Sequence, residues 1–210
     1  MEEEKSVLRR IKKNEIDKVS RMMGECFVDY PLYDIFFNEN KHRLECVYCF
    51  FKARTYSRMD YTYITEDGNI AVCVKRPGDS ELPLWKTLLR HPLLFFRCMH
   101  IMPVPKMIGL ISDLGKTTEP LQKQFYDPEK DMNIQVVCVS KEMRASGMFF
   151  KVLSELDDGT PAYMETHTKH NVELYEKMGA HLCGSVDWHG VTHYVLRREA
   201  VNKSAEKTEG

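Results

Sequence analysis

The order of β-type and helical patterns in the last third of the chain restricts the folds that it can adopt. Short runs of β-formers alternate there with segments of helical spacing. We expect these elements at residues 133–139, 146–157, 161–166, 170–178, 182–188 and 192–197. Strands that alternate with helices favour an α/β fold in which some neighbouring strands are parallel. The pair His189-Gly190 predicts a hairpin turn between the last two strands.

In the first half of the chain the spacing of apolar residues also changes, from helical to strand-like. Asn14 is a candidate N-cap for a first helix, and Tyr30-Pro31 is expected to end it, because a residue before proline avoids the α region. Asp67-Gly68 predicts a hairpin turn. Strands are expected at 6–11, 61–65 and 69–74, and a second helix over about 39–58.

Residues 80–130 form a helical insertion interrupted by prolines. Its helical pieces are expected near 84–90, 93–101, 106–115 and 118–126. The most apolar stretch, 92–111, contains Arg97, His100 and Lys106. Since a membrane span needs about 20 mostly uncharged residues, this stretch predicts buried helix and turn, and no membrane contact is expected.

Composition limits the class of protein. The chain has 210 residues, with 30 basic and 31 acidic side chains and a net charge of −1, so a nucleic-acid partner is not expected. Its length and apolar content fit one domain over 1–200 with a polar tail at 201–210. The acidic start is unlike a signal peptide, and seven scattered cysteines suggest no disulfide framework, so we expect a cytoplasmic protein.

The segment 136–153 contains the first candidate site. A β-run leads through a short turn into a helix expected to begin near Ser146, whose apolar positions from Phe149 onward follow helical spacing. The first turn of a helix offers free N–H groups and a positive dipole to an anion. Gly147 would let a phosphate approach the backbone closely. A simple strand–turn–helix joint is the alternative interpretation.

A second motif, about twenty residues further on, gives the first one a context. Residues 171–180 read Asn-Val-Glu-Leu-Tyr-Glu-Lys-Met-Gly-Ala. Together with Arg144-Ala145-Ser146-Gly147-Met148-Phe149 and the order of elements along nearly the whole chain, this resembles the GNAT superfamily of N-acetyltransferases. The resemblance implies a single-domain α/β (α+β) fold with a mixed, mostly antiparallel twisted sheet.

The resemblance also implies acetyl-CoA as the co-substrate. In that family the pattern Q/R-x-x-G-x-G/A binds the CoA pyrophosphate, which places Arg144 to Phe149 at the phosphates. The last position is usually Gly or Ala, whereas this chain has Phe149. Its side chain is expected to pack in the core; if it pointed at the pyrophosphate instead, CoA affinity would fall.

The implied reaction is direct attack of a primary amine on the thioester in a ternary complex. Backbone N–H groups near Cys138 and Val139 are candidate donors to the oxyanion, and Tyr175 occupies the family's position for the acid that protonates the leaving thiolate. Packing in the core is the alternative role for Tyr175. Asn171 is expected to be the N-cap or a first-turn residue of the helix, to bond the pantetheine arm, or to do both.

The general base is the least defined part of the site. Glu165 and His167 share one face of their strand end and are candidates, with an ordered water relay as an equal alternative. No metal ion is expected: Cys46-x-x-Cys49 has no second pair and lies in a helical pattern. The aromatic residues at 30–37 are expected either to line an acceptor pocket or to form a small core beneath their loop.

Three functions follow from the sequence. The leading hypothesis is an acetyl-CoA-dependent N-acetyltransferase for a small molecule or peptide amine, acting as a monomer or homodimer. The alternatives are a non-catalytic protein of the same fold that binds CoA or another ligand, and a transferase of a longer acyl group.

Overall fold

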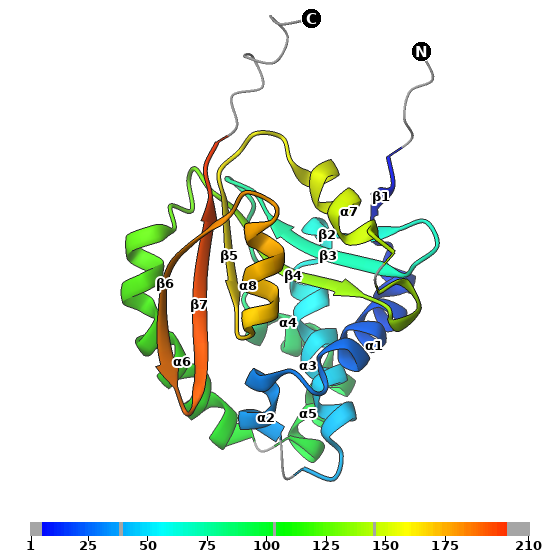
Figure 1. Ribbon diagram of the computed structural model, residues 1–210. Coiled ribbons are helices and arrows are strands. Elements are labelled where there is room, and N and C mark those ends of the chain that lie inside the picture. Colours follow the sequence, from blue (N-terminus) through cyan, green and yellow to red (C-terminus); the bar gives the residue numbers. More distant parts are fainter. Residues whose placement is uncertain (1–5, 38–39, 103, 145, 201–210) are drawn as a thin grey trace, which may run out of the picture.

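A seven-stranded mixed sheet forms the centre of the computed structural model, which describes residues 6–37, 40–102, 104–144 and 146–200 (Figure 1). The strands are β1 (Leu8–Arg10), β2 (Thr62–Thr65), β3 (Ile70–Lys75), β4 (Met132–Val139), β5 (Ala162–Thr166), β6 (His181–Trp188) and β7 (Val191–Arg198). Their spatial order is β1-β2-β3-β4-β5-β7-β6. Of the paired neighbours, only β4 and β5 are parallel. The predicted fold class is confirmed.

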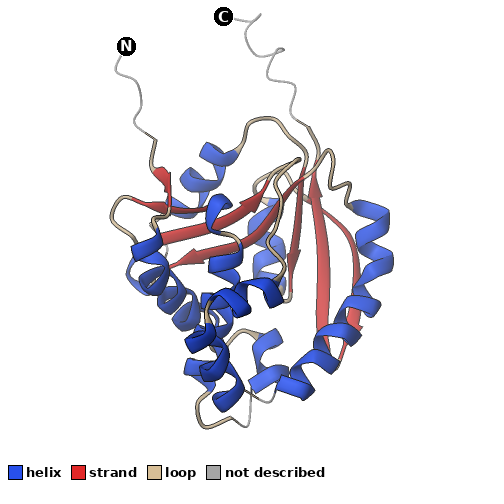
Figure 2. Ribbon diagram, turned by 180° about the vertical axis from the view of Figure 1, so that it is seen from behind, coloured by secondary structure: helices blue, strands red, loops and turns tan. Residues whose placement is uncertain are grey.

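Helices cover both faces of this sheet (Figures 1 and 2). They are α1 (Ile16–Phe27), α2 (Pro31–Phe37), α3 (Arg43–Ser57), α4 (Leu84–Arg90), α5 (Pro92–Ile101), α6 (Val104–Phe125), α7 (Met148–Leu156) and α8 (Lys169–Glu176). Short 3₁₀ turns occur at Lys13–Glu15, Met59–Tyr61 and Lys141–Met143. One core cluster lies among α1 to α6, and a second lies beneath α7 and α8.

Strand β3 shows why the sheet is buried on both sides. Ala71 belongs to the first core cluster, whereas Ile70 and Val72 belong to the second. Successive side chains of a strand point to opposite faces, so a strand covered by helices on both faces must be apolar at every position. This accounts for the continuous apolar run of β3 and its almost complete burial.

Strands β4 and β5 pair over a short distance and then separate. The parallel register covers Met132↔Ala162, Asn133↔Tyr163 and Ile134↔Met164. Beyond these pairs, β4 and β5 run in different directions (Figure 1). The second half of β4 therefore has a neighbouring strand, β3, on one edge only.

Several predicted boundaries are wrong. Asn14 is not an N-cap: it lies in a 3₁₀ turn, where the Glu15 carboxylate accepts the Lys12 N–H at 2.8 Å and α1 begins at Ile16. Tyr30-Pro31 does not end the first helix, since α1 stops at Phe27 and Pro31 opens α2. Proline suits a first helical position because its missing N–H would be unpaired there.

Residues 84–125 are largely helical, and the last two of the four expected helical pieces form a single helix. Helix α6 continues through Pro120, which removes the N–H that would bond the Lys116 carbonyl. Both residues are exposed, so water can satisfy that carbonyl. Among the described residues no single helix has the length and apolar run of a membrane span, and one bent pair, α5 with α6, meets that test jointly.

Candidate functional site

A cleft of about 610 Å³ opens where β4 and β5 separate. Its walls come from the α1–α2 junction, the end of β4, the turn into α7 and the first two turns of α8. The lining residues are Cys26, Phe27, Tyr30, Val137, Cys138, Val139, Met143, Arg144, Gly147, Phe149, Phe150, Thr168, His170, Asn171, Leu174 and Tyr175. Both sequence motifs therefore meet across one cavity.

The β4 wall presents backbone groups to this cleft. The Ser140 N–H donates to the Asn69 carbonyl at 2.8 Å, toward β3. Because backbone groups alternate in direction along a strand, the N–H groups of Val139 and Val137 face the opposite, open edge. The Val139 carbonyl agrees with this direction, since it accepts a bond from the Cys26 thiol at 3.2 Å. The same alternation turns the Cys138 N–H toward β3.

The turn into α7 forms the second wall. Gly147 is the N-cap of the helix with a φ of 75°, a left-handed conformation that favours glycine. The helix thus begins at Met148 and not near Ser146, and Gly147 precedes its first turn. The Ser146 hydroxyl donates to the Met143 carbonyl at 2.7 Å. The predicted contribution of Ala145 lies outside the described residues.

Arg144, Met148 and Phe149 complete the first motif. Arg144 is exposed and lines the cleft, and Met148 packs against the second core cluster. Phe149 does both: its ring is partly buried against that cluster, lies 6.1 Å from the Tyr175 ring and also lines the cleft. The expected core packing is therefore partial, and one edge of the phenyl ring remains in the cavity wall.

Helix α8 supplies the third wall. Its N-cap is Thr168, whose hydroxyl accepts the Asn171 N–H at 3.3 Å. Asn171 lies in the first turn of α8, and its side chain donates to the Thr166 hydroxyl of β5 at 3.0 Å. Tyr175 follows one turn later, buried except for 8% of its surface, and lines the cleft. Burial, with a smaller contribution from Tyr30, raises the pKa of Tyr175.

Tyr30 joins the α1–α2 junction to the end of β5. Its hydroxyl is 2.9 Å from the Thr166 hydroxyl and accepts the His167 N–H at 2.7 Å. Of the aromatic residues at 30–37, Tyr30 lines the cleft, while Tyr33, Phe36 and Phe37 are buried in the first core cluster. Both alternatives weighed for this segment thus apply, each to different residues.

The two candidate bases lie beside the cleft and are not among its lining residues. They are connected through His193 of β7: the His167 Nε2 atom is 3.1 Å from His193 Nδ1, and His193 Nε2 is 3.8 Å from a Glu165 oxygen. Glu165 also accepts bonds from Tyr163 at 2.6 Å and from Gln122 at 2.8 Å. We call Glu165, His193 and His167 the polar chain, which ends next to Tyr30. The two histidines are hydrogen-bonded, whereas the buried His193 Nε2 atom has no hydrogen-bond partner among the described residues and only approaches Glu165.

The electrostatics of this chain keep both histidines neutral. Burial, and then the neighbouring His193, lower the pKa of His167 to about 3. Burial also lowers the pKa of His193, against the opposing effect of Glu165. Sequence reasoning missed His193 as part of the site. The only signal was its position on the strand that pairs with β5, which requires the sheet order to be known.

Two cysteines, Cys26 and Cys138, line the cleft. A hydrogen bond from Cys138, and then Arg144, lower the pKa of Cys26 to about 7, whereas the same interaction raises the pKa of Cys138. Arg144 thus makes the cleft favourable for negative charge.

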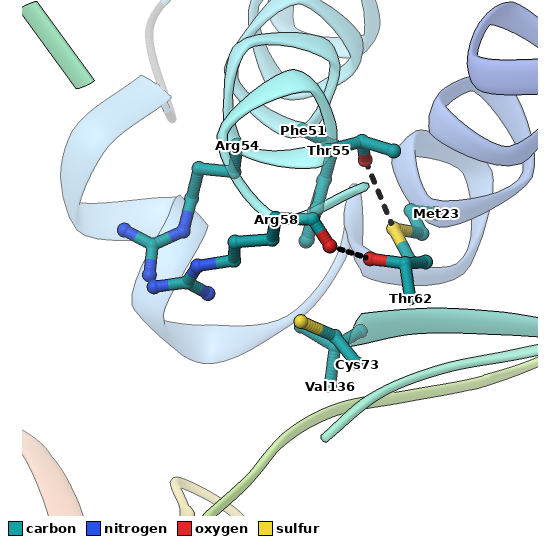
Figure 3. A pocket seen from close by; sticks show the side chains of 8 residues that line it. All are labelled: Met23, Phe51, Arg54, Thr55, Arg58, Thr62, Cys73 and Val136. Carbon is teal, nitrogen blue, oxygen red and sulfur yellow. Dashed lines mark hydrogen bonds between the residues drawn. The ribbon is translucent and has the colours of Figure 1, made fainter. Parts of the chain in front are cut away.

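The other described cavities are unsuited to a substrate. The one shown in Figure 3, between α3 and the sheet, has about 10 Å³, room for about one water molecule. The Cys46-x-x-Cys49 pair is buried in α3 beside Cys98. Among the described residues no group of three His, Cys, Asp or Glu side chains could hold a metal ion.

Comparison with known proteins identifies the fold. No protein-family model matches the sequence, and a search of curated proteins finds no significant match. Solved structures that the chain resembles include a Corynebacterium glutamicum protein described as "histone acetyltransferase HPA2 and related acetyltransferase", with 12% identity over 93% of this chain and 96% of that one, at a TM-score of 0.64. Arylalkylamine N-acetyltransferase 2 of Aedes aegypti has 14% identity over 91% and 97%, at 0.59. An N-acetyltransferase of Staphylococcus aureus has 12% identity over 91% and 100%, at 0.54.

Proposed function

Since the chain has the fold of the GNAT acetyltransferases, we propose that it is an acetyl-CoA-dependent N-acetyltransferase that acts on a primary amine of a small molecule or peptide. One observation supports this above all others. The two motifs that resemble the family, far apart in sequence, face one another across the 610 Å³ cleft at the separation of β4 and β5.

In this proposal the donor lies along the cleft with its pyrophosphate at the start of α7. Amides at the start of a helix lack acceptors within that helix, so we assign the Gly147 and Phe149 amides to the phosphate oxygens. The proposed phosphate-binding residues are Arg144, Ala145, Ser146, Gly147, Met148 and Phe149. The pantetheine arm then extends past Asn171 toward Val139.

The chemistry proceeds by direct attack within a ternary complex. The neutral amine nitrogen forms a bond to the thioester carbon, and the carbonyl oxygen becomes an oxyanion. The Val139 N–H stabilises this oxyanion, and Cys138 is the neighbouring residue, whose own N–H is turned toward β3. Collapse of the tetrahedral species breaks the carbon–sulfur bond. The Tyr175 hydroxyl, which its raised pKa keeps protonated before the reaction, donates its proton to the departing thiolate, and the resulting tyrosinate regains a proton from solvent.

The amine must lose a proton before or during attack, and we assign this step to the polar chain beside the cleft. His167 and His193 stay neutral near pH 7, so each has a ring nitrogen with a free lone pair, but their lowered pKa values make them weak bases that hold a proton only while it passes on to water. Glu165 ends the chain and is about one-third exposed, so the proton reaches solvent there once His193 and Glu165, now 3.8 Å apart, close to hydrogen-bond distance. A water between His167 and the amine is part of this route, because His167 does not line the cleft.

Purified protein mixed with acetyl-CoA and a panel of primary amines tests the function. We expect free thiol to appear in proportion to amine consumed, and calorimetry to show donor binding without any amine. Parallel reactions with propionyl- and succinyl-CoA identify the acyl group.

Each outcome separates the alternatives. Donor binding without thiol release on any amine would favour the non-catalytic alternative, to which the Phe149 ring in the cavity wall lends some support. Faster reaction with a longer donor would favour the acyl alternative. If the protein neither bound the donor nor released thiol with any amine, the proposal as a whole would be contradicted. A cytoplasmic location and a monomeric or homodimeric state remain predictions.

A further inference from the structure

Helices α4 and α5 and the first half of α6 leave an unusual amount of apolar surface uncovered. Of the eleven large hydrophobic side chains that are exposed among the described residues, eight lie here. They are Trp85, Leu89, Leu93, Phe95, Phe96, Met99, Ile108 and Ile111. Leu93 is 86% exposed, Leu89 71% and Phe96 66%. We call these eight residues the α4–α6 surface.

These helices are apolar on the side away from the core as well as on the side toward it. In α5, Leu94 and Cys98 are buried in the first core cluster, and both Leu93 and Phe96 are exposed. Helices α4 and α5 contact α3 and each other, which fixes their inner sides. A helix that is apolar on all sides needs a second partner to cover the side that faces away from the core.

The charges on this surface have one sign. No Asp or Glu occurs in the segment 83–112, whereas Lys86, Arg90 and Lys106 are exposed there. A fourth cation, Arg97, is already paired with Glu45. The Lys86 ammonium lies 5.4 Å from the Trp85 ring, so aromatic and cationic groups occur together.

We propose that the α4–α6 surface binds an anionic lipid bilayer, lying in the interface without spanning it. Exposed Trp, Phe and Leu side chains enter the boundary between headgroups and acyl chains, and Lys86, Arg90 and Lys106 bind the lipid phosphates. This goes beyond acetyl transfer, does not depend on it, and differs from the sequence-based expectation of no membrane contact.

Two other occupants fit the observations less well. A second copy of the chain, packed symmetrically, would place this cationic surface against itself with no carboxylate from 83–112 to pair the charges. An acidic protein helix would pair the cations, but a side chain as exposed as that of Leu93 projects into solvent and does not line a groove that would hold such a helix. A bilayer needs no groove, and it satisfies apolar and cationic groups together.

Sedimentation of the full chain with vesicles tests the proposal. We compare phosphatidylcholine vesicles with vesicles that also contain about 30% phosphatidylserine. We expect at least about tenfold stronger binding to the anionic vesicles, weakening as salt rises. The double variant Leu93→Ser/Phe96→Ser and the double variant Lys86→Glu/Arg90→Glu should each lower that binding about tenfold or more.

Leu182→Ser is the matched control, because Leu182 is also exposed but lies on β6, away from this surface. It should bind vesicles like the parent chain, and an unchanged Tm in every variant shows that each still folds. Binding that is absent, equal for both lipids, or unaffected by the two double variants would overturn the proposal. So would a dimer of the parent chain that the Leu93→Ser/Phe96→Ser variant converts to a monomer, which would assign the surface to a second copy.

Discussion

Tyr175 shows how position changes the chemistry of an ordinary side chain. The ring packs in the second core cluster, where the helical spacing of α8 would place any aromatic residue. The residue also lines the cleft, and burial raises the pKa of its hydroxyl, which therefore stays protonated as the proposed acid. The packing and catalytic interpretations of this residue are compatible, since the ring serves one and the hydroxyl the other.

Replacing Tyr175 with Phe removes only the hydroxyl. We expect kcat for acetyl transfer to fall about 100-fold, because the thiolate loses its proton donor, while the donor Kd changes less than about twofold. Steady-state kinetics and calorimetry measure the two quantities. Tyr194→Phe, a half-buried tyrosine of β7 that packs against the same cluster, is the control. Equal turnover in both variants would remove Tyr175 as the acid.

At the scale of elements, α1 and α3 pack so closely at Gly24 that little room is left for a side chain there. A Cβ on Gly24 would lie 3.2 Å from the Tyr48 Cα atom, a backbone neighbour that cannot move without moving α3. Gly115 of α6 has no such neighbour within 4 Å. The same residue type therefore has a packing role in one helix and none in the other.

This contrast gives a matched pair of variants. Gly24→Val should lower the free energy of unfolding by about 1–3 kcal/mol, since it forces two helices apart. Gly115→Val should change it by less than about 0.5 kcal/mol. Urea titration measures both. If the two variants were equally stable, the α1–α3 contact would be looser than the structure has it.

Elements differ in how well the sequence predicts them, and the reason is physical. The hairpins at Asp67-Gly68 and His189-Gly190 were predicted closely, because turn chemistry is local. The sequence did not predict the start of α1 or the continuity of α6 through Pro120. Those depend on the Lys12–Glu15 contact and on solvent at one carbonyl, neither of which follows from periodicity.

The residues of the site likewise fall into those that the sequence predicts and those that it does not. Gly147, Asn171 and Tyr175 lie in motifs with fixed spacing, and the structure brings them to one cleft. His193 belongs to no motif and reaches Glu165 and His167 only through the order of strands in the sheet. Tyr30 reaches β5 from more than 130 residues away in sequence. Contacts between distant segments were beyond what spacing could predict.

At the scale of the whole molecule, the buried histidines make folding stability depend on pH. The pKa of His167 falls from about 6.5 in the unfolded chain to about 3 in the folded one, and the pKa of His193 is also lowered. Between those values the unfolded chain binds more protons, so acid favours unfolding.

We therefore expect the free energy of unfolding to decrease as pH falls below about 6.5, with a slope of at most about 1.4 kcal/mol per pH unit for each buried histidine. Urea titrations between pH 7 and pH 4 measure it. His167→Gln should make the slope shallower, and His42→Gln, at an exposed position, should leave it unchanged. A parallel profile for all three proteins would contradict the assigned burial.

The separation of β4 from β5 has a consequence for solvent exchange. On the open edge of β4, the amides of Val137 and Val139 have no neighbouring strand, whereas the Ser140 amide is held by Asn69. In deuterated water the first two should exchange quickly in the free protein and become protected only when a donor occupies the cleft. Ser140 should be slow in both states. The strand is thus a built-in reporter of occupancy, with its reference amide one residue away.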